Sequence, residues 1–205
     1  TETGERPIET LEAGDMVVAR DSGLQPIRWI GSRKLDAIDL KANPKLRPVQ
    51  IPAGALGDNT PQQELTVSPQ HRMMVNSKIV ERMFDVEEIL VPAVKLVGFN
   101  NIKRQDMQTE VEYFHILFDR HEVIIANGAP SESLFTDKQA LKALSAEARK
   151  EITFLFPEIC EKDYTPVPAR QIVQKNKHVA RILERHTKNQ NHLVDISAYT
   201  HQVEN

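Results

Sequence analysis

Short apolar stretches alternate with turn-forming residues over residues 6–126. The stretches MVVA, VQIP, LTV, MMV, ILVP and YFHILF are each of strand length, and Gly, Asp, Asn or Pro lies between most of them. Short strands at close spacing, separated by turn formers, predict an all-β unit. The dipeptide Asn76-Ser77, between residues 72–75 and 78–82, predicts a two-residue hairpin turn.

The apolar pattern changes to helical spacing from Thr136 onward. Thr136 and Gln139 form a capping-box pattern, and Ser145 is placed to cap a second helix that ends at Pro157. After Pro168, apolar residues recur at helical spacing with Lys and Arg between them. This pattern predicts a further amphipathic helix, with an apolar face formed by Ile172, Val173, Val179, Ile182 and Leu183.

The change of pattern predicts two regions in the chain. Residues 1–133 are expected to form a mainly β domain, and residues 134–205 a C-terminal α-helical appendage. The sequence after residue 189 is polar and predicts a frayed tail.

Composition excludes several classes of function. With 26 basic and 29 acidic residues the net charge is −3, so no overall positive field attracts nucleic acid or anionic lipid. The sequence contains no run of 18 apolar residues, so no membrane span is expected. The single cysteine, Cys160, rules out an internal disulfide or a thiolate metal cage, and composition leaves the cell compartment open.

Ser68-Pro69-Gln70-His71 carries the first pair of residues suited to proton transfer. Proline biases the preceding serine toward extended backbone, so that the hydroxyl and the imidazole can face one peptide of a neighbouring strand. One group could then hydrogen-bond the carbonyl while the other protonates the nitrogen. The alternative is structural: Ser68-Pro69 opens a turn, and His71 is a half-buried strand residue bonded to backbone.

The second candidate segment is the strand pattern VEYFHILFDRHEVIIANGA. Alternation places His115 and Asp119 on one face, and a regular strand would continue that face to His121. A carboxylate beside an imidazole orients the ring and tunes a general acid or base. Two alternatives stay open, a metal site and a row of side chains facing solvent. Asn127-Gly128 is first of all a turn.

Three blocks of the sequence resemble Hint domains, which are shared by hedgehog autoprocessing domains and inteins. LTVSPQHRMMV is similar to the block that carries a Thr/Ser-x-x-His motif, and FDRHEVIIANG to a later block with an acidic residue, a histidine and Ala-Asn-Gly. The opening residues 1–31 resemble the segment that follows the Hint nucleophile. The blocks occur in the family's order over residues 1–133, and ANGAPSES followed by a helical segment resembles the bacterial Hint domains.

This resemblance implies a pseudo-two-fold β-horseshoe that cleaves the peptide bond before its first residue. A cysteine there attacks the preceding carbonyl in an N-to-S acyl shift, so the partner is the protein's own N-terminal flanking polypeptide and no cofactor is needed. Carried over by position, Ser68 polarises the scissile peptide and His71 protonates its departing nitrogen. Asp119 helps to activate the cysteine, and His121 assists breakdown of the intermediate.

The sequence also departs from the Hint pattern. The Cys-x-x-x-Gly-Thr start is expected upstream of Thr1, and Cys160 is a poor substitute, so the chain as given is expected to be inactive and to lack the first strand. No His-Asn pair of a splicing intein occurs, because Asn127 precedes Gly128 and Ala129. The resemblance therefore implies N-terminal cleavage rather than splicing, and it favours a secreted protein.

A non-enzymatic function is the alternative. In that interpretation the β domain is only a scaffold, and the helices after Thr136 recruit a protein partner. The many Lys and Arg residues of this region more often mark a solvated face. The coding sequence upstream of Thr1 separates the two hypotheses, because a cysteine there favours autoprocessing.

Overall fold

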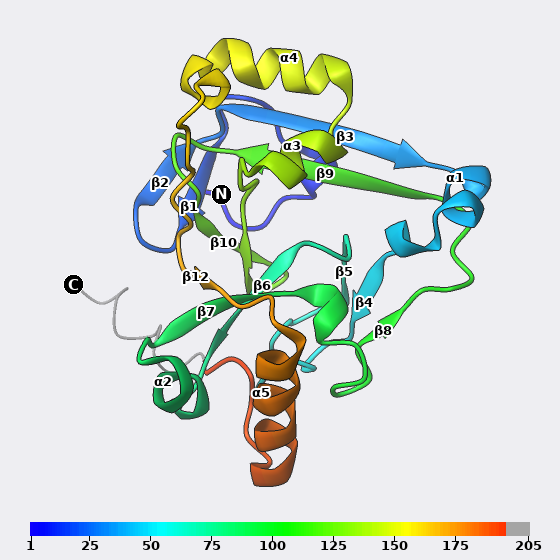
Figure 1. Ribbon diagram of the computed structural model, residues 1–205, viewed down its shortest axis with the longest axis vertical. Helices are drawn as coiled ribbons and strands as arrows, with labels where there is room; N and C mark the ends of the chain where they lie inside the picture. The colour runs from blue at the N-terminus through cyan, green and yellow to red at the C-terminus, as the bar shows by residue number, and fades with distance from the viewer. Residues whose placement is uncertain (196–205) are drawn as a thin grey trace.

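The computed structural model describes residues 1–195 and is mainly β, as the sequence predicts (Figure 1). Within these residues twelve strands form three sheets. The strands are β1 (Met16–Ala19), β2 (Gly23–Pro26), β3 (Trp29–Leu35), β4 (Val49–Ile51), β5 (Leu65–Val67), β6 (Arg72–Asn76), β7 (Glu88–Pro92), β8 (Lys103–Arg104), β9 (Val111–Leu117), β10 (Val123–Ala126), β11 (Ala129–Glu132) and β12 (Gln171–Ile172).

The largest sheet has seven strands in the order β12-β7-β6-β11-β10-β1-β2. All neighbours are antiparallel except β12 and β7. Strand β6 is buried along its whole length, and β11 joins it where Ser131 lies opposite Met73. This pairing joins β6, which directly follows His71, to the β10-β11 hairpin, which follows His121.

Strands β3 and β9 form a separate antiparallel ribbon over seven residue pairs, from Trp29 opposite Leu117 to Leu35 opposite Val111. Gly31 is required in this ribbon, since a Cβ atom there would lie 2.3 Å from the Trp29 ring. The Trp29 indole N–H donates to Glu151 of the helix above at 2.8 Å. The ribbon therefore carries the two helices at residues 138–143 and 146–155 on one face, as Figure 1 shows.

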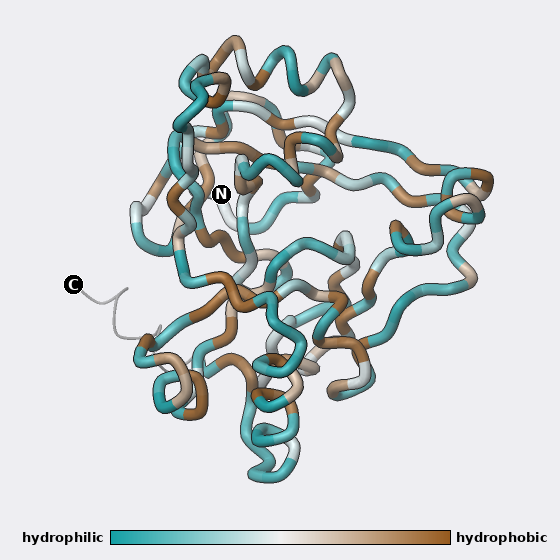
Figure 2. Tube along the Cα trace, in the orientation of Figure 1, coloured by the Kyte–Doolittle hydropathy of each residue, from teal (hydrophilic) through white to brown (hydrophobic). Residues whose placement is uncertain are grey.

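The third sheet, β5-β4-β8, packs against the main core of the protein. That core gathers residues from β4, β6 and β7 together with the C-terminal helix, and Figure 2 shows hydrophobic positions concentrated along β6 and β7. Its completely buried members include Val49, Val75, Val91 and Leu96.

Five α-helices lie within the described residues, and a capping side chain marks the start of the first four. They are α1 (Ala37–Ala42), α2 (Lys78–Phe84), α3 (Lys138–Ala143), α4 (Ala146–Leu155) and α5 (Asn176–Asn189). Ser145 caps α4 by accepting the N–H of Ala148 at 3.0 Å, which confirms its predicted role. The capping box predicted at Thr136 is wrong, because Asp137 caps α3 and the Thr136 hydroxyl bonds that of Tyr164 instead.

The hairpin turn predicted at Asn76-Ser77 is also wrong. Ser77 accepts the N–H of Val80 at 3.2 Å and caps α2, so a helix separates β6 from its antiparallel neighbour β7. Serine serves both turns and helix caps, and the apolar pair Ile79 and Val80 selects the helix because both side chains are buried.

The C-terminal segment joins the main sheet and core. Ile172 and Val173, predicted to start a helix, instead lie in and just after β12, whereas Val179 and Ile182 are buried on α5. Residues 190–195 are not frayed, since Leu193 and Val194 are buried. The rest of the predicted tail lies outside the described residues.

None of the helices described in residues 1–195 combines the length and apolar character that crossing a bilayer requires. The longest, α5, is an amphipathic surface helix with Val179, Ile182 and His186 buried.

His186 fixes α5 to α2. Its ring is completely buried, with Nδ1 2.7 Å from the Ile182 carbonyl and Nε2 2.9 Å from the Ser77 hydroxyl. Because a carbonyl only accepts, Nδ1 donates to Ile182 and the neutral Nε2 accepts from Ser77. Burial lowers the pKa of His186, which keeps the ring in this neutral form.

We expect His186→Ala to lower the free energy of unfolding by about 2–4 kcal/mol, because it empties a buried site and removes two hydrogen bonds. Urea denaturation of the whole chain at pH 7.5 measures the change. Thr187→Ala, at the exposed next position of α5, is the control and should alter stability by less than about 0.5 kcal/mol. Equal effects of the two substitutions would contradict this role for His186.

Candidate active site

His71 stands at the entrance to β6, after a turn that begins at Ser68. The carbonyl of Ser68 accepts the N–H of His71 at 3.1 Å, and the carbonyl of His71 accepts the N–H of Ala93 at 2.8 Å. Both bonds are made by backbone, so the imidazole is left to interact with the residues around it. Burial lowers the pKa of His71, although the Glu132 carboxylate opposes this shift.

Glu132, at the end of β11, is the central acid of the cluster. Its side chain is 7% exposed and accepts the backbone N–H of Arg72 at 2.8 Å and the Arg72 guanidinium at 2.8 Å. Arg72 also reaches Asp137 at 3.3 Å and lies over the ring of Phe135. Burial alone would raise the pKa of Glu132, but His121, His71 and Arg72 together lower it, so this carboxylate is ionised at neutral pH.

His121 contacts Glu132 from the other side. Its side chain is 3% exposed, and Nε2 lies 3.3 Å from Glu132 Oε2, too bent for a good hydrogen bond, so the contact is mainly electrostatic. Nδ1 accepts the backbone N–H of Ala169 at 3.0 Å, which places the proton of the neutral ring on Nε2, facing Glu132. The Phe135 ring packs on the imidazole with centroids 4.7 Å apart.

His115 is the third histidine of the cluster and lies on β9, opposite Gly31. The pKa of His115 is lowered to about 4, mainly by burial and in part by the positive charge that His71 can carry, while Glu132 opposes both effects. The charges of His71 and Glu132 thus act on His115, and Glu132 acts on His71, so the three groups belong to one cluster.

The structure brings together only part of the residue set predicted from the sequence. His71 and His121 both adjoin Glu132, and Ser68 is half-buried in the turn before His71. Asp119 instead points to solvent, with its side chain 57% exposed and 3.3 Å from Arg28. The expectation that His121 continues the face of His115 is wrong, because β9 ends at Leu117 and the chain bends before His121.

Sequence reasoning missed Glu132 and Arg72. Both lie in strands that are buried along their length, where an unpaired charge is costly, so each needs an opposite charge nearby. A basic residue in one predicted buried strand and an acidic residue in another are a sequence signal that could have identified Arg72 and Glu132 as a pair.

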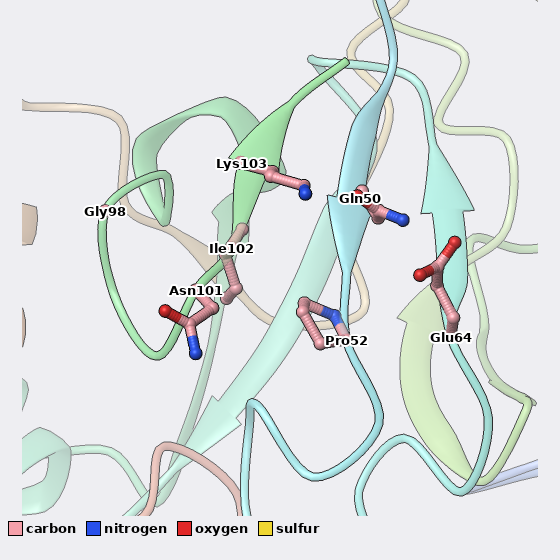
Figure 3. Close-up of a pocket in the computed structure, with 7 residues that line it drawn as sticks. All are labelled: Gln50, Pro52, Glu64, Gly98, Asn101, Ile102 and Lys103. Atoms are coloured by element: carbon pink, nitrogen blue, oxygen red, sulfur yellow. The ribbon is translucent and has the colours of Figure 1, made fainter.

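A shallow groove of about 450 Å³ lies elsewhere, across the third sheet (Figure 3). Figure 3 shows Gln50 of β4 between Lys103 of β8 and Glu64 at the start of β5. None of its lining residues belongs to the histidine cluster: Gln50, Pro52, Glu64, Gly98, Asn101, Ile102 and Lys103. The Asn127 amide supports this edge by donating to the Glu64 carbonyl at 2.9 Å.

In the part of the chain that the structure describes, no three His, Cys, Asp or Glu side chains are arranged to hold a metal ion. His115, Asp119 and His121, the set considered as ligands, are separated by the end of β9. The cluster around Glu132 therefore offers proton transfer and electrostatics rather than a ready ligand set.

Comparison with protein families gives a match to the model described as Hint domain over residues 1–138. The match contains Ser68, His71, His115, His121 and Glu132. No curated protein and no solved structure matches the chain.

The half-buried histidines His71 and His115 make stability depend on pH. The pKa values of His71 and His115 are lowered in the folded protein, to about 4 for His115, so the unfolded chain takes up protons first as the pH falls below 6.5. The contribution of these histidines to the free energy of unfolding should be complete above pH 6.5. It should decline between pH 6.5 and about 4, by on the order of 3 kcal/mol from His115 alone. Urea denaturation at several pH values measures this decline.

His115→Gln should make the pH dependence shallower because it removes one titrating group. His192→Gln is the matched control, since the His192 side chain is 49% exposed, and should leave the slope unchanged. A wild-type stability that does not change between pH 7 and pH 5 would contradict the neutral, buried state of these rings.

Proposed function

The chain belongs to the Hint-domain family, and from this premise we propose that it carries out the autoprocessing reaction of that family, cleavage of a peptide bond on its N-terminal side by an intramolecular acyl shift. The observation that carries the proposal is the cluster of the half-buried His71 and His115 with the buried side chains of His121 and Glu132, within the residues that match the family. The pseudo-two-fold horseshoe of Hint domains is part of the proposal.

The proposed reaction needs groups that move protons next to one peptide. A cysteine thiolate attacks the carbonyl carbon of the preceding peptide bond, a C–S bond forms, the C–N bond breaks, and the nitrogen leaves as an amine after taking up a proton. The thioester then passes its acyl group to water or to another thiol. The only reactant besides the polypeptide is the water or thiol that accepts the acyl group, so no cofactor is required.

His71 is suited to deliver the proton to the leaving nitrogen. Its lowered pKa means that the ring is neutral at pH 7 and that its protonated form is a stronger acid than an ordinary imidazolium. A proton that it receives as the thiolate forms is therefore passed on readily to the leaving nitrogen, and Glu132 stabilises the charged intermediate. Ser68, one turn earlier, is proposed to donate its hydroxyl to the scissile carbonyl.

The other two candidate residues enter the reaction differently. Asp119 is exposed, so it is accessible to a segment that docks from outside and could orient the cysteine as the family resemblance implies. His121 has protein groups at both ring nitrogens, and we propose that it acts through Glu132 in this conformation rather than by touching the substrate.

The substrate of the proposed reaction is the protein's own N-terminal flanking polypeptide, and the nucleophile is a cysteine ahead of Thr1. Cys160, the single cysteine of the sequence, is exposed at the end of the 3₁₀ turn that follows α4. It belongs to the region after residue 138, whereas the histidine cluster belongs to the matched region. We therefore propose no role for Cys160 in cleavage.

The test uses the chain together with the residues that its gene encodes ahead of Thr1, incubated with a small thiol and followed by intact mass. We expect thiol-dependent release of the N-terminal segment, and residues 1–205 alone, as the control, should keep their mass. A cysteine-bearing extension that stays intact with thiol would overturn the proposal and favour the scaffold hypothesis.

His71→Ala in the extended chain should slow cleavage by about 10²–10⁴-fold, the usual contribution of a positioned general acid. The free energy of unfolding should fall by only about 1–2 kcal/mol, because the turn around His71 is held by backbone bonds. His192→Ala is the control and should leave the rate unchanged. A His71→Ala chain that is less stable yet cleaves at the normal rate when folded would assign His71 a structural role only.

A further inference from the structure

We propose that residues 168–172, beyond the part that matches the Hint family, form a strap that positions His121 and so completes the histidine cluster. The activity claim rests on the proposed function, whereas the positioning claim concerns the folded chain alone. In Figure 1 the chain between α4 and α5 passes beside β1 and β2 before it reaches β7, so it links parts of the fold that are far apart.

The contact with His121 is made by backbone. Ala169 donates its N–H to Nδ1 of His121 at 3.0 Å, and Ala169 packs with Ile172 beside the buried residues Met74, Leu90 and Val123. An N–H donor at Nδ1 is compatible only with a ring whose proton is on Nε2. The strap therefore fixes both the orientation and the tautomer of the imidazole.

Arg170 clamps the strap on the side that faces the sheet edge. Its guanidinium donates to both carboxylate oxygens of Asp21, at 2.7 and 2.8 Å, and its Nε donates to Glu88 at 2.6 Å. Glu88 is only 9% exposed and also pairs with Arg20, so the network is partly shielded from water. The hydrogen bonds to Asp21, and then those to Glu88, hold the pKa of Arg170 above its usual value, and the bidentate geometry fixes the direction of the side chain.

The strap is also part of the main sheet. β12 pairs in parallel with β7, Gln171 opposite Ile89 and Ile172 opposite Leu90, and Val173 donates to the Leu90 carbonyl at 2.9 Å. The Arg170 clamp and the β12 pairing both directly follow Ala169 in the chain, which limits how far its N–H can move from His121.

Glu132 and Arg72 connect His121 to His71, the candidate proton donor. Nε2 faces Glu132, Glu132 binds the backbone and side chain of Arg72, and Arg72 directly follows His71. A displaced His121 would change the surroundings of Glu132, which is the charge that acts most strongly on His71. Arg170 and Ala169 are therefore positioning residues, because they reach the candidate proton donor only through other groups.

The experiment uses Ala169→Pro and Arg170→Ala. Proline removes the N–H that binds Nδ1, and alanine releases the clamp. The controls are Val167→Pro, at a position that is 82% exposed and already precedes a proline, and Arg181→Ala on the exposed side of α5. Circular dichroism and urea denaturation confirm that each variant is folded before it is compared.

The first readout is the imidazole ¹⁵N spectrum of residues 1–205 at pH 7.5, with His121 assigned by His121→Gln. We expect the wild type and both controls to show Nδ1 as an unprotonated acceptor and Nε2 as protonated. In Ala169→Pro and Arg170→Ala the Nδ1 signal should lose its hydrogen-bond shift. An unchanged signal in both folded variants would overturn the positioning claim, whether or not the protein cleaves itself.

The second readout is thiol-dependent cleavage of the N-terminally extended chain. Both strap variants should cleave roughly 10- to 100-fold more slowly, the effect of a small misplacement near reacting groups, while the controls keep the wild-type rate. Arg170→Lys, which keeps the charge but not the bidentate geometry, should fall between wild type and Arg170→Ala. Variants with an altered His121 signal and a normal rate would overturn the activity claim and leave the proposed function standing.

Discussion

The candidate site depends on the burial of one ionised carboxylate. Removing a carboxylate from water costs several kcal/mol unless charges and N–H donors replace the lost hydration. Glu132 receives them from Arg72, whose backbone and guanidinium each bind it at 2.8 Å. Since Glu132 ends β11 and Arg72 begins β6, this pair reinforces the junction of the two strands, which share the register pair Ser131 and Met73.

The balance of charge around Glu132 explains why the histidines remain neutral. Arg72 already compensates the charge of Glu132, and Asp137 gives the guanidinium a second acid at 3.3 Å. A proton on His71 or on His115 would therefore add an uncompensated charge to partly desolvated surroundings, which is why burial is the largest cause of the lowered pKa of each. Neutral rings close to a fixed negative charge are suited to short-lived protonation, which a proton shuttle requires.

Local patterns predicted more of the fold than of the site. Short strands with turn formers predicted the β class, and the Ser145 hydroxyl predicted the start of α4, because both depend on neighbours in sequence. The pairing of Glu132 with Arg72 joins residues 60 positions apart and leaves no local signal beyond a charge in an apolar strand. Extrapolating a regular strand from β9 failed at Asp119, where the chain bends. The catalytic roles and the boundary at residue 133 stay predictions.

The contacts of His121 show that the cluster includes residues outside the part of the chain that matches the family. Within residues 1–138 the ring has an acid at Nε2 and an aromatic face at Phe135, but its partner at Nδ1 is the N–H of Ala169. A chain cut after the match would leave a buried ring nitrogen without its donor and would also remove β12 from the edge of β7. Either this donor is replaced by water, or the ring turns; in both cases Glu132 loses the fixed neighbour that now helps to lower its pKa. The C-terminal segment is therefore joined to the cluster by chemistry as well as by packing.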